Sequence, residues 1–454
     1  MKTENHTDYR ATSNACKLCS PLGASLVFRG IENSVPLLHG SQGCSTYIRR
    51  YLISHFNEPV DIASSNFTEE TAVFGGGANL KLAMDNIIRQ YHPELIGVAT
   101  TCLSETIGDD VPMILRNYSG ENGEDAAPAV VSVSTPSYSG THMDGFHGAV
   151  KATVAAMAQK KGKAGEHINL FPGMLSPADY RHLKEIFEDF GAKIHLLPDY
   201  SETLEGGLWS EYQKIPPGGT PVKQITAMGD ALATVEMGRI LAETESAGKL
   251  LEDRFRVPCF RVGIPMGIKE TDTFFDAVST ITKRKVPEKY LKERARLIDA
   301  YVDGHKYIFE ARAVIYGEED LVVGLASFLS EIGVVPVLCA SGGKSGYLNA
   351  KLAQVIDDFE TKGIQVMDGA DFVEIGEAAK KLSPDFFMGN SKGYKTAREM
   401  NKPLIRIGFP IHDRMGGGRI VHIGYRGAQQ LFDTISNTVI ASRQDASPVG
   451  YTYM

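Results

Sequence analysis

The sequence lacks a long apolar run, a signal-type N-terminus and an excess of basic charge. In its 454 residues no stretch approaches the ~20 consecutive apolar residues that a membrane-spanning helix needs. The first eight residues are polar, without the apolar core of a signal peptide. The formal net charge is −8, and no basic stripe indicates nucleic-acid binding. We therefore expect a cytoplasmic protein with neither a membrane nor a nucleic-acid partner.

Cysteine is scarce, with only six in the chain, but its distribution is uneven. Four of the six lie in the first 102 residues: Cys16, Cys19, Cys44 and Cys102. A disulfide framework is not expected in a reducing cytosol, so clustered thiols indicate metal or redox chemistry. Cys259 and Cys339 stand in apolar surroundings and are expected to be buried hydrophobic residues.

Short apolar runs of strand length alternate with longer segments of helical periodicity. Strands are predicted at 35–38, 95–99, 129–133, 168–171, 194–197, 311–315, 334–338 and 404–407. Helices are predicted at 45–56, 80–91, 145–158, 178–190, 287–304, 321–332 and 428–443. Apolar strands without strict alternation, separated by helices, are typical of buried parallel sheets. The fold class is therefore α/β, with parallel sheets flanked by helices.

Composition shifts predict two domain boundaries. A basic, glycine-containing break covers 160–167, and a second break follows the charged helix 287–304. We expect three α/β domains over 1–165, 166–305 and 306–454, each close to the usual domain size. The thiol-rich region belongs to the first of them.

Common catalytic and nucleotide-binding motifs are missing. Ser341-Gly-Gly-Lys-Ser345 resembles the end of a P-loop, but Leu338 stands where the first glycine should be. No HExxH motif occurs, and the carboxylate pair Asp109–Asp110 is of a kind common on surfaces. No nucleophile or general base is predicted, and no catalytic residue is assigned.

The thiols instead stand at element ends. Cys44 ends a glycine-punctuated loop after the strand at 35–38, and Cys102 follows the strand at 95–99. Cys16 and Cys19 precede a helix start. These loops can meet at the carboxyl edge of a parallel sheet, where open α/β folds bind ligands. All-thiolate ligation suits zinc or an iron–sulfur cluster, and the residues alone leave both open.

Several blocks, in order along the chain, resemble the beta-type subunit of nitrogenase component 1. The blocks are Cys19–Ala24, His39–Cys44, Glu69–Gly76, Thr100–Asp110, Ser134–His142 and Ile407–Arg414. Together they extend over nearly the whole chain.

The resemblance implies three Rossmann-like domains and an α₂β₂ heterotetramer with an alpha-type partner. It implies an iron–sulfur cluster between the two chains, either a [4Fe–4S] or a P-cluster-like one. The positions matching Cys19, Cys44 and Cys102 ligate that cluster in the catalytic beta chain. Ser137 is similar to a small polar residue beside it, and Cys16 is a further candidate ligand. The substrate-reducing cofactor belongs to the alpha-type chain.

Within the family, two roles compete. Cys16-Lys-Leu-Cys19 and the stretches 134–147 and 197–204 are similar to NifN, the beta-like half of the scaffold that matures the iron–molybdenum cofactor. That role implies a NifE-like alpha-type partner, a cofactor precursor in the complex and transient docking of an ATP-dependent iron protein. Retention of Cys19 and Cys102 with Cys44 keeps a catalytic beta subunit open, in a nitrogenase or in a reductase such as methylthio-alkane reductase. A zinc-binding structural protein is the alternative from another class.

Overall fold

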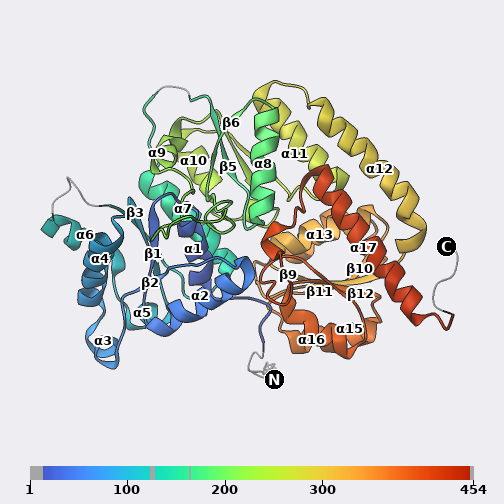
Figure 1. The fold of residues 1–454 in the computed structure, drawn as a ribbon, viewed down its shortest axis with the longest axis horizontal. Coiled ribbons are helices and arrows are strands. Elements are labelled where there is room, and N and C mark those ends of the chain that lie inside the picture. The colour runs from blue at the N-terminus through green and yellow to red at the C-terminus, as the bar shows by residue number, and fades with distance from the viewer. Residues whose placement is uncertain (1–13, 123–127, 163–164, 450–454) are drawn as a thin grey trace, which may run out of the picture.

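Three parallel β-sheets, each flanked by helices, form the protein in its computed structural model, which describes residues 14–122, 128–162 and 165–449 (Figure 1). Every pairing between named strands is parallel. The predicted α/β class is therefore confirmed.

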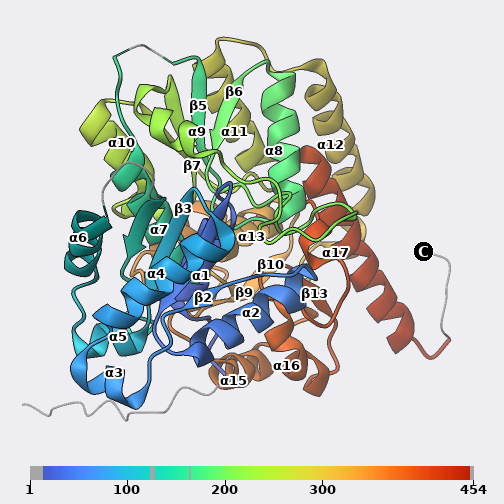
Figure 2. The same ribbon diagram turned by 60° about the vertical axis from the view of Figure 1, so that its left-hand side comes forward.

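The first sheet has the strand order β2-β1-β3-β4. Its strands are β1 (Ser34–His39), β2 (Ala63–Ser64), β3 (Leu95–Thr100) and β4 (Ala129–Val133). The helices of this unit are α1 (Ser20–Arg29), α2 (Gln42–Phe56), α3 (Glu69–Phe74), α4 (Gly77–Tyr91), α5 (Cys102–Ile107), α6 (Val111–Asn122) and α7 (His142–Met157). Both ribbon views place α3 and α5 at the lower left of the molecule (Figures 1 and 2).

The second sheet has the order β6-β5-β7-β8. Its strands are β5 (His167–Phe171), β6 (Lys193–Leu196), β7 (Ala233–Met237) and β8 (Cys259–Val262). Its helices are α8 (Pro177–Asp189), α9 (Val222–Thr226), η1 (Ala227–Asp230), η2 (Leu241–Glu243), α10 (Ala247–Phe255), α11 (Gly267–Thr282) and α12 (Glu288–Ile308).

The third sheet has the order β11-β10-β9-β12-β13. Its strands are β9 (Arg312–Gly317), β10 (Val335–Ser341), β11 (Gln365–Met367), β12 (Phe386–Gly389) and β13 (Leu404–Arg406). Its helices are α13 (Glu319–Glu331), α14 (Leu348–Val355), α15 (Phe372–Leu382), η3 (Ser391–Gly393), α16 (Tyr394–Glu399), η4 (Gly417–Arg419) and α17 (Gly424–Ala446).

Helix α1 is buried along its whole length and crosses α7 at very short range. A Cβ atom on Gly23 would lie 1.7 Å from the carbonyl oxygen of His142, and one on Gly145 would lie 1.9 Å from that of Ser20. Only glycine permits this approach of the two backbones. The crossing fixes the position of the residue that precedes α1, which is Cys19.

One continuous hydrophobic core joins the three sheets. It includes Leu38 of β1, Leu170 of β5 and Ile315 of β9, each with no exposed surface. Two smaller clusters lie under the first and third sheets. The predicted boundary after residue 305 falls near the end of α12, and both domain boundaries remain predictions.

All eight predicted strands correspond to strands of the structure, and all seven predicted helices to helices. No pattern in the sequence predicted strands β2, β7, β8, β11 and β12. Within the described residues, no helix has the length and apolar character needed to cross a membrane.

Candidate metal centre

Three thiols stand at the starts of three helices in the first unit. Cys19 is the N-cap of α1, Cys44 lies in the first turn of α2, and Cys102 is the first residue of α5. Cys19 is exposed, and the other two are half-buried. The positive end of a helix dipole favours a thiolate over a thiol. All three positions can be reached from outside the chain.

The three thiols lie within electrostatic reach of one another. Burial raises the pKa of Cys44, and the nearby thiols of Cys19 and Cys102 raise it further. Ser137 connects the other two: its backbone N–H donates to the Cys102 sulfur at 3.3 Å, and its hydroxyl accepts from Ser20 N at 3.1 Å. The structure thus brings Ser137 into contact with the Cys102 sulfur and with the residue after Cys19.

The loops that carry Cys44 and Cys102 leave the same edge of the first sheet. β1 and β3 are neighbours, with His39 opposite Thr100 in the register. The backbone N–H and hydroxyl of Thr101 both donate to the carbonyl oxygen of His39, at 3.2 and 3.0 Å. The expected meeting of these loops at the carboxyl edge of a parallel sheet is what the structure shows.

A second pair of hydrogen bonds fastens the loop after β4 to the same edge. The Thr135 backbone N–H donates to the Thr100 hydroxyl at 2.8 Å, and the Thr135 hydroxyl donates to the Thr100 carbonyl at 2.6 Å. Because Ser137 follows two residues later, these two hydrogen bonds position the Ser137 N–H against the Cys102 sulfur.

Cys16 lies apart from the other three thiols. It is 4% exposed and packs in the apolar cluster of the third sheet with Tyr316 and Phe372. Its backbone N–H donates to the Ala370 carbonyl at 3.1 Å, and burial raises its pKa to about 12. The structure therefore does not bring Cys16 to the thiols with which the sequence grouped it, because the chain before α1 crosses to the third unit.

Among the described residues, no three Cys, His, Asp or Glu side chains lie close enough to hold a single metal ion.

Sequence reasoning missed a buried pair beside these loops. His39 has no exposed surface, and its Nε2 lies 3.0 Å from Oδ2 of Asp109. Burial lowers the pKa of His39, and the neighbouring carboxylate only partly offsets this. The sequence signal was present, since His39 precedes the Cys44 loop and Asp109 ends the Cys102 block, but the Asp109–Asp110 pair read as surface charge.

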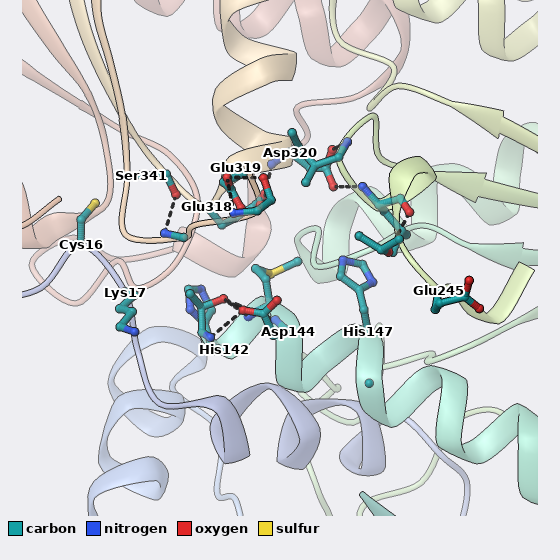
Figure 3. Close-up of a pocket in the computed structure, with 18 residues that line it drawn as sticks. Cys16, Lys17, His142, Asp144, His147, Glu245, Glu318, Glu319, Asp320 and Ser341 are labelled. Atoms are coloured by element: carbon teal, nitrogen blue, oxygen red, sulfur yellow. Dashed lines mark hydrogen bonds between the residues drawn. The ribbon is translucent and has the colours of Figure 1, made fainter. Parts of the chain in front are cut away.

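A separate cavity of about 330 Å³ lies where the three units meet (Figure 3). It is lined by the segment around Cys16, by the start of α7 and by the loops after β7, β9 and β10. His142, Asp144 and His147 face it from α7, opposite Glu318, Glu319 and Asp320.

Two acids of this cavity accept hydrogen bonds from backbone N–H groups. Asp320 accepts from Ile240 N and Leu241 N, at 2.7 and 3.2 Å, and so ties the third unit to the second. Glu318 accepts from the first turn of α13. Burial raises the pKa of both Glu318 and Asp320. The residues of this cavity therefore contribute to the contact between the units.

The structure defines a class of protein: parallel α/β units around one core, with thiols at a sheet edge. Comparison with known proteins identifies the family. The sequence model of the nitrogenase component 1 type oxidoreductases matches residues 19–440. The chain belongs to this family, as the sequence blocks indicated.

Its relatives are beta-type chains. The nitrogenase molybdenum-iron protein beta chain of Clostridium pasteurianum is 34% identical over 427 residues, which cover 94% of this chain and 93% of that one. The iron-molybdenum cofactor biosynthesis protein NifN of a Nostoc strain is 31% identical over 432 residues, 95% of this chain and 94% of that one. The chain is thus a member of the beta-like group of nitrogenase component 1 subunits.

The fold agrees with solved structures. A chain of the structure titled "Nitrogenase Cp1 at pH 6.5" superposes with a TM-score of 0.93 at 33% identity, covering 99% of this chain and 98% of that one. A chain of "Nitrogenase Cp1 at pH 5" gives 0.72 at 16% identity, which shows a shared fold alone.

Proposed function

We propose that this protein is the beta-type subunit of a nitrogenase component 1 complex and that Cys19, Cys44 and Cys102 hold one side of an iron–sulfur cluster. The observation that carries the proposal is the gathering of three accessible thiols, from three helix starts, at one sheet edge. The cluster supplies reversible one-electron transfer.

The residues present fit such a cluster. Thiolates are the usual ligands of iron–sulfur clusters, and N–H groups directed at sulfur tune their potential. Ser137 supplies such an N–H to Cys102, and the Ser41 hydroxyl lies 3.9 Å from the Cys44 sulfur. The chain's own part is to ligate, to orient the thiolates and to shield them.

The cluster is shared with an alpha-type partner in this proposal. Three thiols do not complete the coordination of a cubane, so the remaining ligands come from another chain. Exposed apolar side chains flank the thiols: Tyr47 is 65% exposed and Tyr138 66%, and Leu103 adjoins Cys102. Apolar surface around an incomplete ligand set supports a partner interface there. We place the chain in an α₂β₂ heterotetramer.

For the role of that complex, we propose the scaffold on which the iron–molybdenum cofactor is matured, with a NifE-like partner that carries the cofactor precursor. The stretches 134–147 and 197–204 support it, as does the NifN relative. An ATP-dependent iron protein would dock transiently, with the exposed Arg50 of α2 available to it. No catalytic residue is needed in this chain for that role.

The second candidate is a catalytic beta subunit. Two observations favour it: all three cluster cysteines are present, and molybdenum-iron beta chains are 33 to 36% identical to this chain against 31% for NifN. In this role the cluster would relay electrons to a cofactor held by the alpha-type chain.

The test is anaerobic co-purification with the alpha-type partner, followed by iron analysis and EPR across a redox titration. A cubane signal from a reduced [4Fe–4S] cluster would support the scaffold. A double cubane that is silent when reduced and visible when oxidised would support the catalytic subunit. Zinc without iron would refute both.

A further inference from the structure

The carboxylate of Asp109 joins three segments of the first unit. Its Oδ2 lies 3.0 Å from His39 Nε2, and the backbone N–H of Gly76 donates to Oδ1 and Oδ2 at 3.2 and 3.0 Å. His39 ends the strand that leads to Cys44, and Asp109 follows the helix that begins at Cys102. Gly76 stands between α3 and α4. The Asp109 side chain therefore joins the Cys44 loop and the Cys102 loop to the turn between α3 and α4.

The hydrogen bonds around His39 fix its protonation. Ser65 Oγ accepts from the Gly40 backbone N–H at 3.0 Å, so its own proton is free to be donated to Nδ1 of His39, also 3.0 Å away. The ring proton then lies on Nε2 and is donated to Asp109. Because burial lowers the pKa of His39, the ring is neutral, and the pair retains the negative charge of the carboxylate.

Gly76 is required for this arrangement. A Cβ atom there would lie 2.8 Å from Asp109 Oδ2 and 2.3 Å from the ring of Phe67. Phe67 in turn packs edge-on against His39, with ring centroids 4.8 Å apart. The backbone amide reaches the carboxylate only because no side chain intervenes. The side chain of Asp109 is 9% exposed, so its charge is poorly screened by solvent.

We propose that Asp109, acting through His39, is a positioning residue for the iron–sulfur cluster that fixes the Cys44 loop against the Cys102 loop and lowers the reduction potential of the cluster. The inference rests on the proposed function. A fixed negative charge near a cluster favours its oxidised state, which carries less electron density. Outer residues that orient ligands tune metal sites in the same way.

The experiment replaces Asp109 by Asn in the chain co-produced with its alpha-type partner. Asn can still accept a hydrogen bond from His39, but it carries no charge. We expect iron content close to wild type, a midpoint potential shifted upward, and faster deuterium exchange at the Gly76 amide.

The matched control is Asp110→Asn, one residue along. Asp110 is exposed, and its carboxylate caps Met113 N at 2.9 Å, which Asn can also do. This control should leave the potential and the Gly76 exchange unchanged. Asp109→Glu, which restores the charge, should bring the potential back toward wild type. If Asp109→Asn fails to bind iron, recovery of iron in Asp109→Glu would support the positioning role, and failure in both would count against it.

An unchanged potential in an iron-replete Asp109→Asn complex would overturn the inference, as would an equal shift in the Asp110 control. A wild-type complex without iron would instead refute the proposed function. In that case the Gly76 exchange rate in the metal-free chain still decides whether Asp109 holds the loops.

Discussion

Five of the six cysteines form two groups that differ in position. The sixth, Cys259 in β8, is half-buried rather than buried as the sequence led us to expect. Cys19, Cys44 and Cys102 begin helices at a sheet edge and are exposed or half-buried. Cys16 and Cys339 lie inside the third unit, where burial raises the pKa of Cys16 to about 12 and that of Cys339 further. Backbone placement therefore decides whether a cysteine is accessible for ligation or is a packing residue.

The largest expected effect separates the groups by metal content. The double variant Cys44→Ala, Cys102→Ala should lose the iron of the complex, because it removes two of three thiolates while the α/β core remains. Cys16→Ala should keep the iron, since its sulfur packs in another unit. Iron analysis after anaerobic purification measures both, and circular dichroism controls for folding. Retained iron in the double variant would refute the ligand assignment.

Thiol reactivity should separate the groups next. A rise in pKa from 9.0 to about 12 lowers the thiolate fraction of Cys16 about a thousandfold at neutral pH. In the metal-free chain we expect iodoacetamide to modify Cys19 and Cys102 first, and Cys16 and Cys339 only in denaturant. Peptide mass spectrometry over time gives the order, and early labelling of Cys16 would contradict its placement.

A third test displaces helix α1, which begins directly after Cys19. Gly23→Ala would place a Cβ atom 1.7 Å from the His142 carbonyl oxygen, a backbone atom that cannot yield, and should cost about 3 kcal/mol of unfolding free energy. The control Gly120→Ala meets nothing within 4 Å in α6 and should stabilise by about 0.5 kcal/mol. Urea unfolding of the metal-free chain measures both, and equal effects would contradict the α1–α7 crossing.

The smallest effect concerns acid and the core around the C-terminal end of α2. His55 at the end of α2 accepts from Ile411 N at 2.9 Å, and burial lowers its pKa from 6.5 to about 4. The His55 imidazole binds a proton more tightly in the unfolded chain than in the folded chain. The free energy of unfolding is therefore highest above pH 6.5 and decreases as the pH falls toward 4. From pH 6.5 to 5 the loss is about 2 kcal/mol.

His55→Asn keeps an acceptor for Ile411 without the titration. The variant is less stable at neutral pH, but its stability should fall less steeply with acid than that of wild type. Urea unfolding at several pH values compares the slopes. If the unfolding free energies of wild type and variant fall equally steeply with acid, His55 does not contribute to the pH dependence.

The five strands that the sequence did not predict are short or contain a charged residue. β1 and β3 are buried at every position and stood out as apolar runs. β7 lies centrally in its sheet but contains Glu236, which is buried and accepts from Ser246 and from Gly248 N. Ser246 and Gly248 lie about ten residues after Glu236, so the pattern of apolar residues within the strand could not reveal these contacts. β12 has only four residues.

The candidate centre was predictable where a local signal existed. Glycines and strand ends marked Cys44 and Cys102, and the structure places both loops at one sheet edge. The different positions of Cys16 and Cys19 depend on Ala370, which is more than 350 residues away in sequence and bonds to the Cys16 backbone. The role of Asp109 depends likewise on Gly76 and His39. Long-range contacts of this kind leave no trace in residue spacing.

The core shared by the three sheets makes heat resistance a property of the whole chain. Leu38, Leu170 and Ile315 belong to one apolar contact network, so melting any sheet exposes surface of the others. A calorimetric scan of the metal-free subunit should then show one endotherm whose van't Hoff and calorimetric enthalpies agree. A substitution in the third sheet, far from any thiol, lowers the temperature at which the thiol-bearing edge is lost.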